Sequence, residues 1–226
     1  MHEPDMGFDS ELLSDVFFYD CKIDPERAIV PALTDPRAIR SRAALLAVAE
    51  QLLDEAHADE LTVTEVASRA GVSRPTFYQH FADVSALIAA AVVAELETSF
   101  ARSDAQLTDR VGVEFLRGTN RMLLEQVSLR RDVYRRVLRG SSNSVVLSAT
   151  IGYISRRMSE RVLGAHLAPG GRGDDDRITA IAAGSTWLVL QWLETDFTGR
   201  NTSEAFAERL TDLMLTLAGV PDTLRR

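Results

Sequence analysis

The stretch TVTEVASRAGVSRPTFYQHF, residues 62–81, predicts two short helices around a tight turn. Thr62 and Glu65 have the spacing of a capping box, in which each side chain bonds a backbone N–H of the other residue. Gly71 is expected to end the first helix, because glycine adopts a left-handed conformation at little cost. Ser73 is a strong N-cap for the second helix. The stretch is therefore expected to form a helix-turn-helix.

The second helix of this stretch has one apolar and one polar face. Phe77 and Phe81 are four residues apart, so they share a face and are expected to point toward the core. Arg74, Tyr78 and Gln79 are left on the opposite side. A short helix with these exposed side chains suits the major groove of DNA. The alternative interpretation is a plain helical hairpin in which the tyrosine and phenylalanines are all core residues.

From roughly Pro36 to Leu87, the chain resembles the DNA-binding head of the TetR family of bacterial transcription regulators. The family pattern appears here as Ala70-Gly71-Val72-Ser73, then Thr76-Phe77-Tyr78-Gln79-His80-Phe81, then the acidic cap Asp83. The family usually has a lysine at the start of the next helix, where this chain has Val84. The resemblance therefore does not supply that phosphate contact.

Nine residues of the helix-turn-helix are expected to contact DNA. Arg74 and Gln79 are predicted to reach base edges, because arginine–guanine and glutamine–adenine pairs have suitable geometry. By resemblance to the family, Pro75 and Tyr78 lie against the same groove. Phosphate contacts are expected from small donors near the helix starts and on the flank of the recognition helix, where backbone N–H groups also face DNA. These donors are Thr62, Thr64, Ser73, Thr76 and His80.

The charge of the chain is unusual for a DNA-binding protein. The 226 residues carry a net charge of −8, and residues 37–81 contain five arginines against six carboxylates, a net of −1. The arginines cluster at the start of the first helix and on the recognition helix, while the carboxylates lie mostly at the far end of the first helix. This segregation predicts specific DNA binding with a weak non-specific component.

Three domains are predicted along the chain. Residues 1–34 form either a partly disordered arm or a segment that docks its aromatic residues on a subunit, residues 35–82 form the helix-turn-helix domain, and residues 83–226 form a helical effector-binding and dimerisation domain. The first helix is expected to bury a stripe of Ile39, Ala43, Leu46, Ala49 and Leu53. Further helices are expected near 83–100, 109–127, 129–139, 144–166, 175–196 and 203–218, the last capped by Ser203. The fold class is therefore all-α.

The last two predicted helices carry more apolar surface than one subunit needs. The helix near 175–196 is apolar almost all round, and the helix near 203–218 has an apolar stripe that includes Leu213 and Leu217. A helix that is hydrophobic on all sides is buried on all sides. In the TetR family the equivalent helices form the dimer interface, so a homodimer is expected. The alternative is an ordinary monomer core.

By resemblance to the family, an apolar cavity between the middle helices is expected to bind a small lipophilic effector. Large residues in these helices are the candidate walls, although aromatic residues at helical spacing are more often core than pocket. The candidates are Phe115, Leu123, Tyr134, Tyr153 and Trp187. The arginine run between 130 and 139 alternates with apolar residues, which indicates a solvated face over an apolar one, or else a site for an anionic ligand.

No sequence signature of an enzyme occurs, so neither catalysis, a cofactor nor a metal site is expected. The single cysteine, Cys21, suits a reducing cytoplasm, and the N-terminal residues lack the pattern of a signal peptide. The longest uncharged run, Ile178–Leu193, is shorter than a membrane span. The interpretation that we favour is a cytoplasmic, homodimeric transcription regulator that binds double-stranded operator DNA with an inverted repeat. We expect a repressor that a small-molecule effector releases from this operator, although no residue pattern separates a repressor from an activator. The alternative is a helical ligand-binding or enzymatic protein with a degenerate head.

Overall fold

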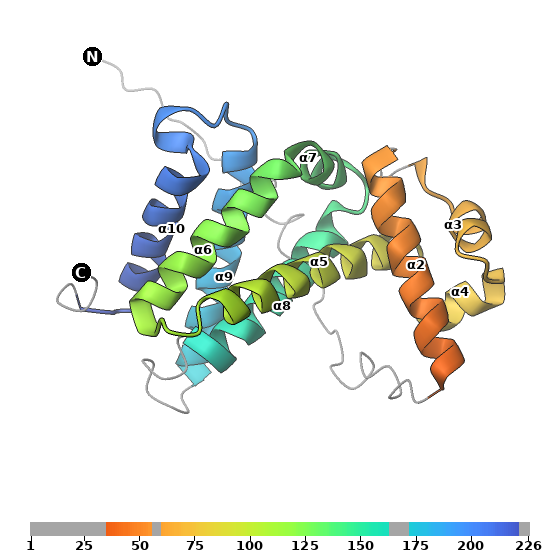
Figure 1. Ribbon diagram of the computed structural model, residues 1–226, viewed down its shortest axis with the longest axis horizontal. Coiled ribbons are helices and arrows are strands. Elements are labelled where there is room, and N and C mark those ends of the chain that lie inside the picture. The colour runs from red at the N-terminus through yellow and green to blue at the C-terminus, as the bar shows by residue number, and fades with distance from the viewer. Residues whose placement is uncertain (1–34, 56–59, 163–171, 222–226) are drawn as a thin grey trace, which may run out of the picture. The chain divides into compact units, whose positions relative to one another are not determined.

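The described part of the chain is built from helices, and no strand occurs within it, which confirms the all-α prediction. The computed structural model describes residues 35–55, 60–162 and 172–221. The helices, drawn in Figure 1, are α2 (Pro36–Glu55), α3 (Val63–Arg69), α4 (Arg74–His80), α5 (Val84–Gln106), α6 (Gly112–Leu129), α7 (Arg131–Arg139), α8 (Asn143–Arg157), the π-helical turn η2 (Met158–Val162), α9 (Arg172–Leu193), the short 3₁₀ helix η3 (Gly199–Asn201) and α10 (Ser203–Leu217).

The turn between α3 and α4 depends on Gly71, which has a φ of 66°. Its N–H donates to the carbonyl of Ser68 at 3.2 Å, and the N–H of Val72 donates to the carbonyl of Ala67 at 3.0 Å. This pair of bonds is a Schellman motif, which satisfies carbonyls at the end of a helix and requires a left-handed residue at the turn. The predicted stop at Gly71 is confirmed.

The start of α3 contains half of the predicted capping box. The side chain of Thr62 accepts a hydrogen bond from the backbone N–H of Glu65 at 3.2 Å. The carboxylate of Glu65 instead lies 3.2 Å from Arg69 Nη2, one turn further along the helix. The helix start is therefore stabilised by the threonine, and the glutamate contributes an exposed ion pair of small energy.

The apolar face of α2 differs from the predicted stripe. Leu45, Val48 and Leu52 are buried with Ala49 and Leu53, whereas Ala43 is exposed and Leu46 only partly buried. The buried positions follow the spacing of three and four residues that places side chains on one helix face. The predicted positions have the same helical spacing but centre on a neighbouring face of the helix, so that Ile39, at the start of the predicted stripe, is also exposed.

α5 packs both in the hydrophobic cluster of the head and against helices of the body. Leu87, Ile88 and Val92 belong to the buried cluster that contains residues of α2, α3 and α4. Phe100, further along the helix, is buried as well, and α5 packs there against α6 and α8 (Figure 1). By length and composition α5 could cross a membrane, but core helices of soluble proteins pass the same test.

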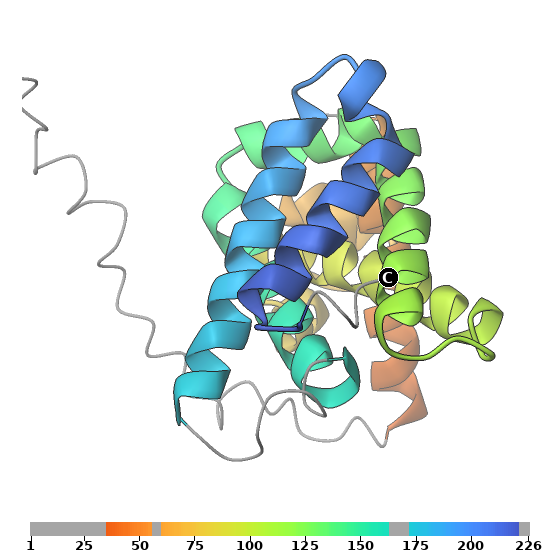
Figure 2. The ribbon, with the colours of Figure 1, turned by 90° about the vertical axis from the view of Figure 1, so that its left-hand side faces the viewer.

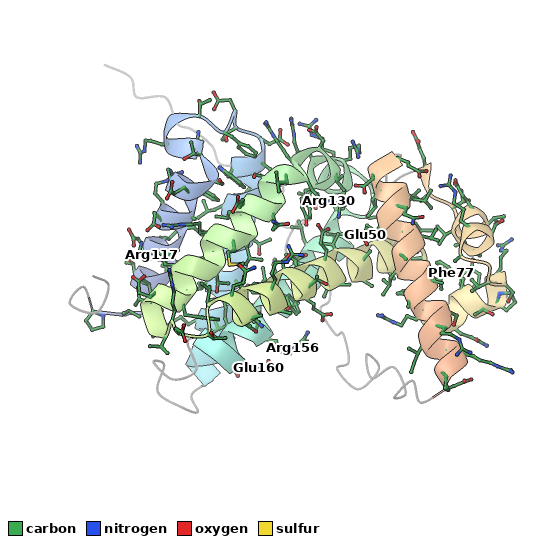
Figure 3. All side chains as sticks on the ribbon, in the orientation of Figure 1. Glu50, Phe77, Arg117, Arg130, Arg156 and Glu160 are labelled. Atoms are coloured by element: carbon green, nitrogen blue, oxygen red, sulfur yellow. The ribbon has the colours of Figure 1, made fainter. Side chains whose placement is uncertain are left out.

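The second core lies among the C-terminal helices. α10 packs against α6 and α9, and Figure 2 shows α9 and α10 side by side. The ring of Trp192 stacks between Phe206, at 5.0 Å between centroids, and Phe197, at 4.4 Å. Ion pairs of Arg117 with Glu208 and Asp212 join α6 to α10 at the edge of this core (Figure 3).

Two helix ends differ from prediction. α10 is capped by Thr202 rather than Ser203, because the Thr202 hydroxyl accepts the N–H of Ala205 at 3.3 Å. The α-helical part of the segment predicted at 144–166 ends at Arg157 and continues as the π-helical turn. The remainder of that segment, like the predicted arm at 1–34, lies outside the described residues.

Candidate nucleic-acid interface and apolar cavity

The recognition helix α4 exposes the predicted polar face. Phe77 is fully buried, and Phe81 is buried beside it with a centroid distance of 6.0 Å. Arg74, Gln79 and Tyr78 are exposed, the last with 51% of its surface accessible. The seven residues of α4 therefore separate into a buried anchor and an outward face that holds a cation, an amide and a phenol.

The start of α4 is shaped by two hydroxyls. Ser73 Oγ accepts the backbone N–H of Thr76 at 3.2 Å, and the two hydroxyls lie 2.8 Å apart. Pro75 falls in the first turn of α4, where its missing N–H costs little. Thr62 and Thr64 are exposed at the start of α3. These small donors thus lie at two helix N-termini, whose partial positive charge favours a phosphate group.

His80 is held by a second helix. Its Nε2 lies 2.8 Å from the hydroxyl of Ser41 on α2, and its Nδ1 is buried with no hydrogen-bond partner among the described residues. One edge of the ring therefore orients α4 on α2, a positional role that the sequence motif did not reveal.

Arg42 is a candidate for DNA contact that the sequence analysis did not single out. Its guanidinium lies 5.3 Å from the centroid of Phe81 and close enough to His80 to lower the pKa of that ring. It therefore adds a positive charge at the end of α4. The cluster of arginines at the start of the first helix was the available signal, but the sequence alone could not bring Arg42 next to α4.

The start of α5 follows the recognition helix directly. Asp83 is the N-cap, and its carboxylate accepts the N–H of Ala86 at 2.8 Å, which confirms the predicted cap. Val84 occupies the first helical position and is partly buried. It joins the hydrophobic cluster of the head, which an exposed lysine would not do.

A cavity of about 150 Å³ lies between the helices of the body. Its wall is formed almost entirely by apolar side chains from α5, α6, α7, α8, α9 and α10. Phe115, Leu123 and Tyr134, three of the five predicted wall residues, line it. A void of this size and lining stays free of water and accepts a molecule about as large as benzene.

Tyr153 and Trp187, the other two predicted wall residues, do not line this cavity. The ring of Tyr153 lies against Phe100, at 5.8 Å between centroids. Trp187 points outward from α9 and is 59% exposed. Their large side chains suggested a wall position, but helix rotation turns them elsewhere, so we leave them out of the proposed ligand site.

Few polar groups line the cavity, and most of them are engaged. Asn120 Nδ2 donates to Thr211 Oγ1 at 2.9 Å, and Arg157 Nη2 donates to Asp104 Oδ1 at 2.6 Å. Thr119 Oγ1 is buried and has no hydrogen-bond partner among the described side chains and backbone. A buried hydroxyl without a partner is unfavourable, so a ligand atom that bonds it would gain that energy.

An apolar surface remains exposed on α9 and α10. Trp187 of α9 is 59% exposed, and Leu213 and Leu217, one turn apart on α10, are 39% and 50% exposed. Phe206, Leu210 and Met214 of α10 face inward and are buried. The prediction that these two helices carry more apolar surface than one subunit buries is therefore consistent with the observed exposure.

The head matches a known sequence family. The sequence model for bacterial regulatory proteins of the tetR family matches residues 45–91, which contain α3, α4 and the first part of α5. No curated protein matches the sequence of this chain.

Solved structures share the fold over most of the chain. The fatty acid degradation regulator FadR of Bacillus halodurans is 17% identical, with 79% of this chain and 99% of that chain covered and a TM-score of 0.50. The R. erythropolis TetR-family repressor QsdR is 17% identical, with 80% and 95% covered and a TM-score of 0.52. The TetR-family repressor AlkX of a Dietzia species is 16% identical, with 78% and 96% covered and a TM-score of 0.52. At this identity, the likeness concerns the fold alone.

His80 predicts a pH dependence of stability. Burial first, and the charge of Arg42 second, hold the pKa of His80 below its ordinary value of 6.5. The unfolded chain therefore takes up a proton near pH 6.5 that the folded chain still refuses, so stability is lost as the pH falls from about 6.5 to the pKa of the folded state. We expect the midpoint of urea unfolding to decrease less between pH 7 and pH 5 in His80→Gln than in the unchanged chain. If the urea midpoint changed equally with pH in both proteins, His80 would not be the source of this pH dependence.

Proposed function

Because the chain belongs to the TetR family of bacterial regulatory proteins, we propose that it acts as a homodimeric repressor that a small apolar molecule releases from its operator. A transcription regulator of this family binds DNA and is not an enzyme. The observation that carries the proposal is α4, with Phe77 buried and Arg74, Tyr78 and Gln79 exposed. Two of the similar structures are described as repressors, which favours repression over activation here. We expect the protein in the cytoplasm, with the DNA.

In the proposed complex, α4 enters the major groove. Arg74 and Gln79 read base edges, because a guanidinium pairs with guanine and a carboxamide pairs with adenine through two hydrogen bonds each. Pro75 and Tyr78 lie against the same groove. The phosphates are held by Thr62, Thr64, Ser73, Thr76 and the end of α4 at His80, and we add Arg42 to this set. The phosphate contacts fix the orientation of the protein on the DNA and carry no sequence information.

Arg74 gives the test of base readout. Arg74→Ala should lose roughly 1–3 kcal/mol of binding to an operator duplex selected from random DNA, and discrimination at one base pair should relax. Thr76→Val, its matched control, should weaken binding to all duplexes about equally. Fluorescence anisotropy at fixed salt measures both. An Arg74→Ala variant with unchanged selectivity would remove Arg74 from the readout.

A two-fold dimer through α9 and α10 covers the exposed apolar surface. Trp187, Leu213 and Leu217 of each subunit would meet the same surface of the other, as in a self-complementary interface. Such a dimer can place two α4 helices about 34–36 Å apart, one turn of DNA, which is why the operator is expected to be an inverted repeat.

Leu213 tests the interface. In Leu213→Glu, two carboxylates related by the dimer axis would be buried together, and like charges in an interface cost several kcal/mol. We expect monomers by multi-angle light scattering and a loss of tight operator binding. Leu129→Glu, at an exposed leucine of α6, is the control and should stay dimeric. A dimer that survives Leu213→Glu would place the interface on another surface.

The apolar cavity is the proposed effector site. Its wall offers no unpaired charge among the described residues, so an ionic ligand would bury its charge without compensation. The effector should therefore be a small lipophilic molecule with one or two polar groups, one of which can bond Thr119 Oγ1. It loosens DNA binding only if it prefers a conformation of the dimer that fits the operator poorly.

Toluene is a suitable probe, since it is slightly larger than benzene and uncharged. We expect it to bind by titration calorimetry and to weaken operator binding of the unchanged protein by about fivefold or more. Leu123→Trp should prevent binding by filling the cavity, whereas Leu129→Trp, on the exposed end of the same helix, should not. Binding that survives Leu123→Trp would place toluene outside the cavity, and binding without any effect on DNA would refute its role as an effector site.

A further inference from the structure

Arg130 joins the end of α2 to α5. Its Nη2 lies 2.6 Å from Asp54 Oδ1, and its Nη1 lies 2.9 Å from Glu95 Oε2 and 3.6 Å from Glu50 Oε1. Glu50 and Asp54 belong to α2, whereas Glu95 belongs to α5. Figure 3 shows Glu50 and Arg130 close together between α2 and α7. The side chains of Arg130 and Glu95 are only 22% and 26% exposed, so water screens their pairing poorly.

The side chain of Arg136 binds backbone carbonyls at the same end of α2. Its Nη2 donates to the carbonyls of Leu53 at 3.0 Å and Asp54 at 3.4 Å. The last carbonyls of a helix have no partner within the helix and carry partial negative charge, so a guanidinium stabilises them. The last turn of α2 is therefore fixed by two arginines, Arg130 just before α7 and Arg136 within it.

The other arginines of the run attach α7 to the end of α9. Arg131 Nε donates to the carbonyl of Leu193 at 2.8 Å. Arg135 and Arg139 each lie 2.7 Å from Glu194. Each arginine of the run is thus paired with a carboxylate or a backbone carbonyl, so the run is a solvated face only in part. The guanidinium groups of the run form ion pairs and hydrogen bonds with α2 on one side of α7 and with the end of α9 on the other.

Tyr134 lies between the apolar cavity and the cluster around Arg130. It lines the apolar cavity, and it also lines a smaller cavity of about 10 Å³ together with Glu50, Glu95 and Arg130. Its hydroxyl lies near the carboxylate of Glu95 at the wall of this smaller cavity, and burial, followed by that negative charge, raises the pKa of the phenol. One side chain therefore meets both a ligand placed in the cavity and a carboxylate that Arg130 shares with α2.

Resting on the proposed function, we propose that Tyr134, Glu95 and Arg130 form the relay by which occupancy of the cavity reaches the DNA-binding head. A ligand that displaces the ring of Tyr134 withdraws its hydroxyl from Glu95. The carboxylate of Glu95 then shifts relative to Arg130. As a result, the distances and strengths of the ion pairs of Arg130 with Asp54 and Glu50 change as well. α2 carries this change to the head, because its buried residues belong to the same hydrophobic cluster as Phe77 of α4.

Two arginines of one short segment allow a matched test of the relay. Arg130→Met removes the cation that faces α2, and Arg135→Met removes a cation that faces Glu194 of α9. Neither residue lines the apolar cavity. Both full-length variants should bind toluene as the unchanged protein does, measured by calorimetry. Toluene should weaken operator binding about fivefold or more in the unchanged protein and in Arg135→Met, but less than about twofold in Arg130→Met.

A second pair of variants tests the relay without any ligand. Tyr134→Phe removes the hydroxyl that faces Glu95 and keeps the ring, whereas Tyr153→Phe removes a hydroxyl of a residue that lines neither cavity. Hydrogen exchange of the α2 amides at 50–55 should become faster in Tyr134→Phe and stay unchanged in Tyr153→Phe. Glu95→Gln should repeat the effect of Tyr134→Phe, and it replaces Arg130→Met if that variant does not fold.

The outcomes separate the relay from the proposed function. Toluene that binds to the unchanged protein without weakening its operator binding would refute the effector role of the cavity. The coupling of Tyr134 to α2 would then be tested by the rate of hydrogen exchange of the α2 amides at 50–55. An equal toluene effect in Arg130→Met and Arg135→Met would overturn the relay alone. So would unchanged exchange at 50–55 in Tyr134→Phe, or equal acceleration in Tyr153→Phe.

Discussion

A helix of seven residues is too short to persist in water by itself, and this constraint governs the DNA-binding head. α4 is stable only because Phe77 is fully buried and Ser73 caps its first turn. Once Phe77 points inward, the helical period leaves Arg74, Tyr78 and Gln79 pointing outward. The same contact that stabilises the helix therefore also presents its readout face, so packing and recognition cannot be varied independently.

The helices of the body, in contrast to α4 in the head, leave a void between them. Protein interiors usually leave few voids larger than a water molecule. An apolar void of about 150 Å³ therefore forfeits packing energy in the empty protein. A ligand that fills it recovers part of that energy, which makes the cavity both a source of instability and a site of control.

The arginines around α7 show how charge is used where the two functions meet. Carboxylates and helix-terminal carbonyls near the end of α2 would repel one another without a cation, and Arg130 and Arg136 supply it. The pair of Arg130 with Glu95 is mostly shielded from water and therefore depends strongly on distance, whereas Asp54 and Glu50 are more than half exposed. The interaction energy of this charge cluster therefore changes when a neighbouring side chain such as Tyr134 shifts by a small distance. The energy of an apolar contact of the same area changes less.

Local signals determined much of the head. The caps at Thr62, Ser73 and Asp83 and the left-handed stop at Gly71 each depend on residues only a few positions apart. Interactions of such short range are readable from sequence because no distant residue has to be placed first. The same holds for the outward direction of Arg74, Tyr78 and Gln79, and for the presence of helices along the body.

Contacts between distant residues were decided by the tertiary structure. The pairing of Arg130 with Asp54 spans 76 positions, and the bond between Ser41 and His80 spans 39. Which face each helix buries depends on the neighbours it meets, so Tyr153 and Trp187 turned away from the cavity although their size suited its wall. Sequence alone determined that this chain carries a helix-turn-helix on a helical body. Only the packing of its helices decided where the cavity lies and which charges link it to the head, because both arise from groups that the chain brings together only after it has folded.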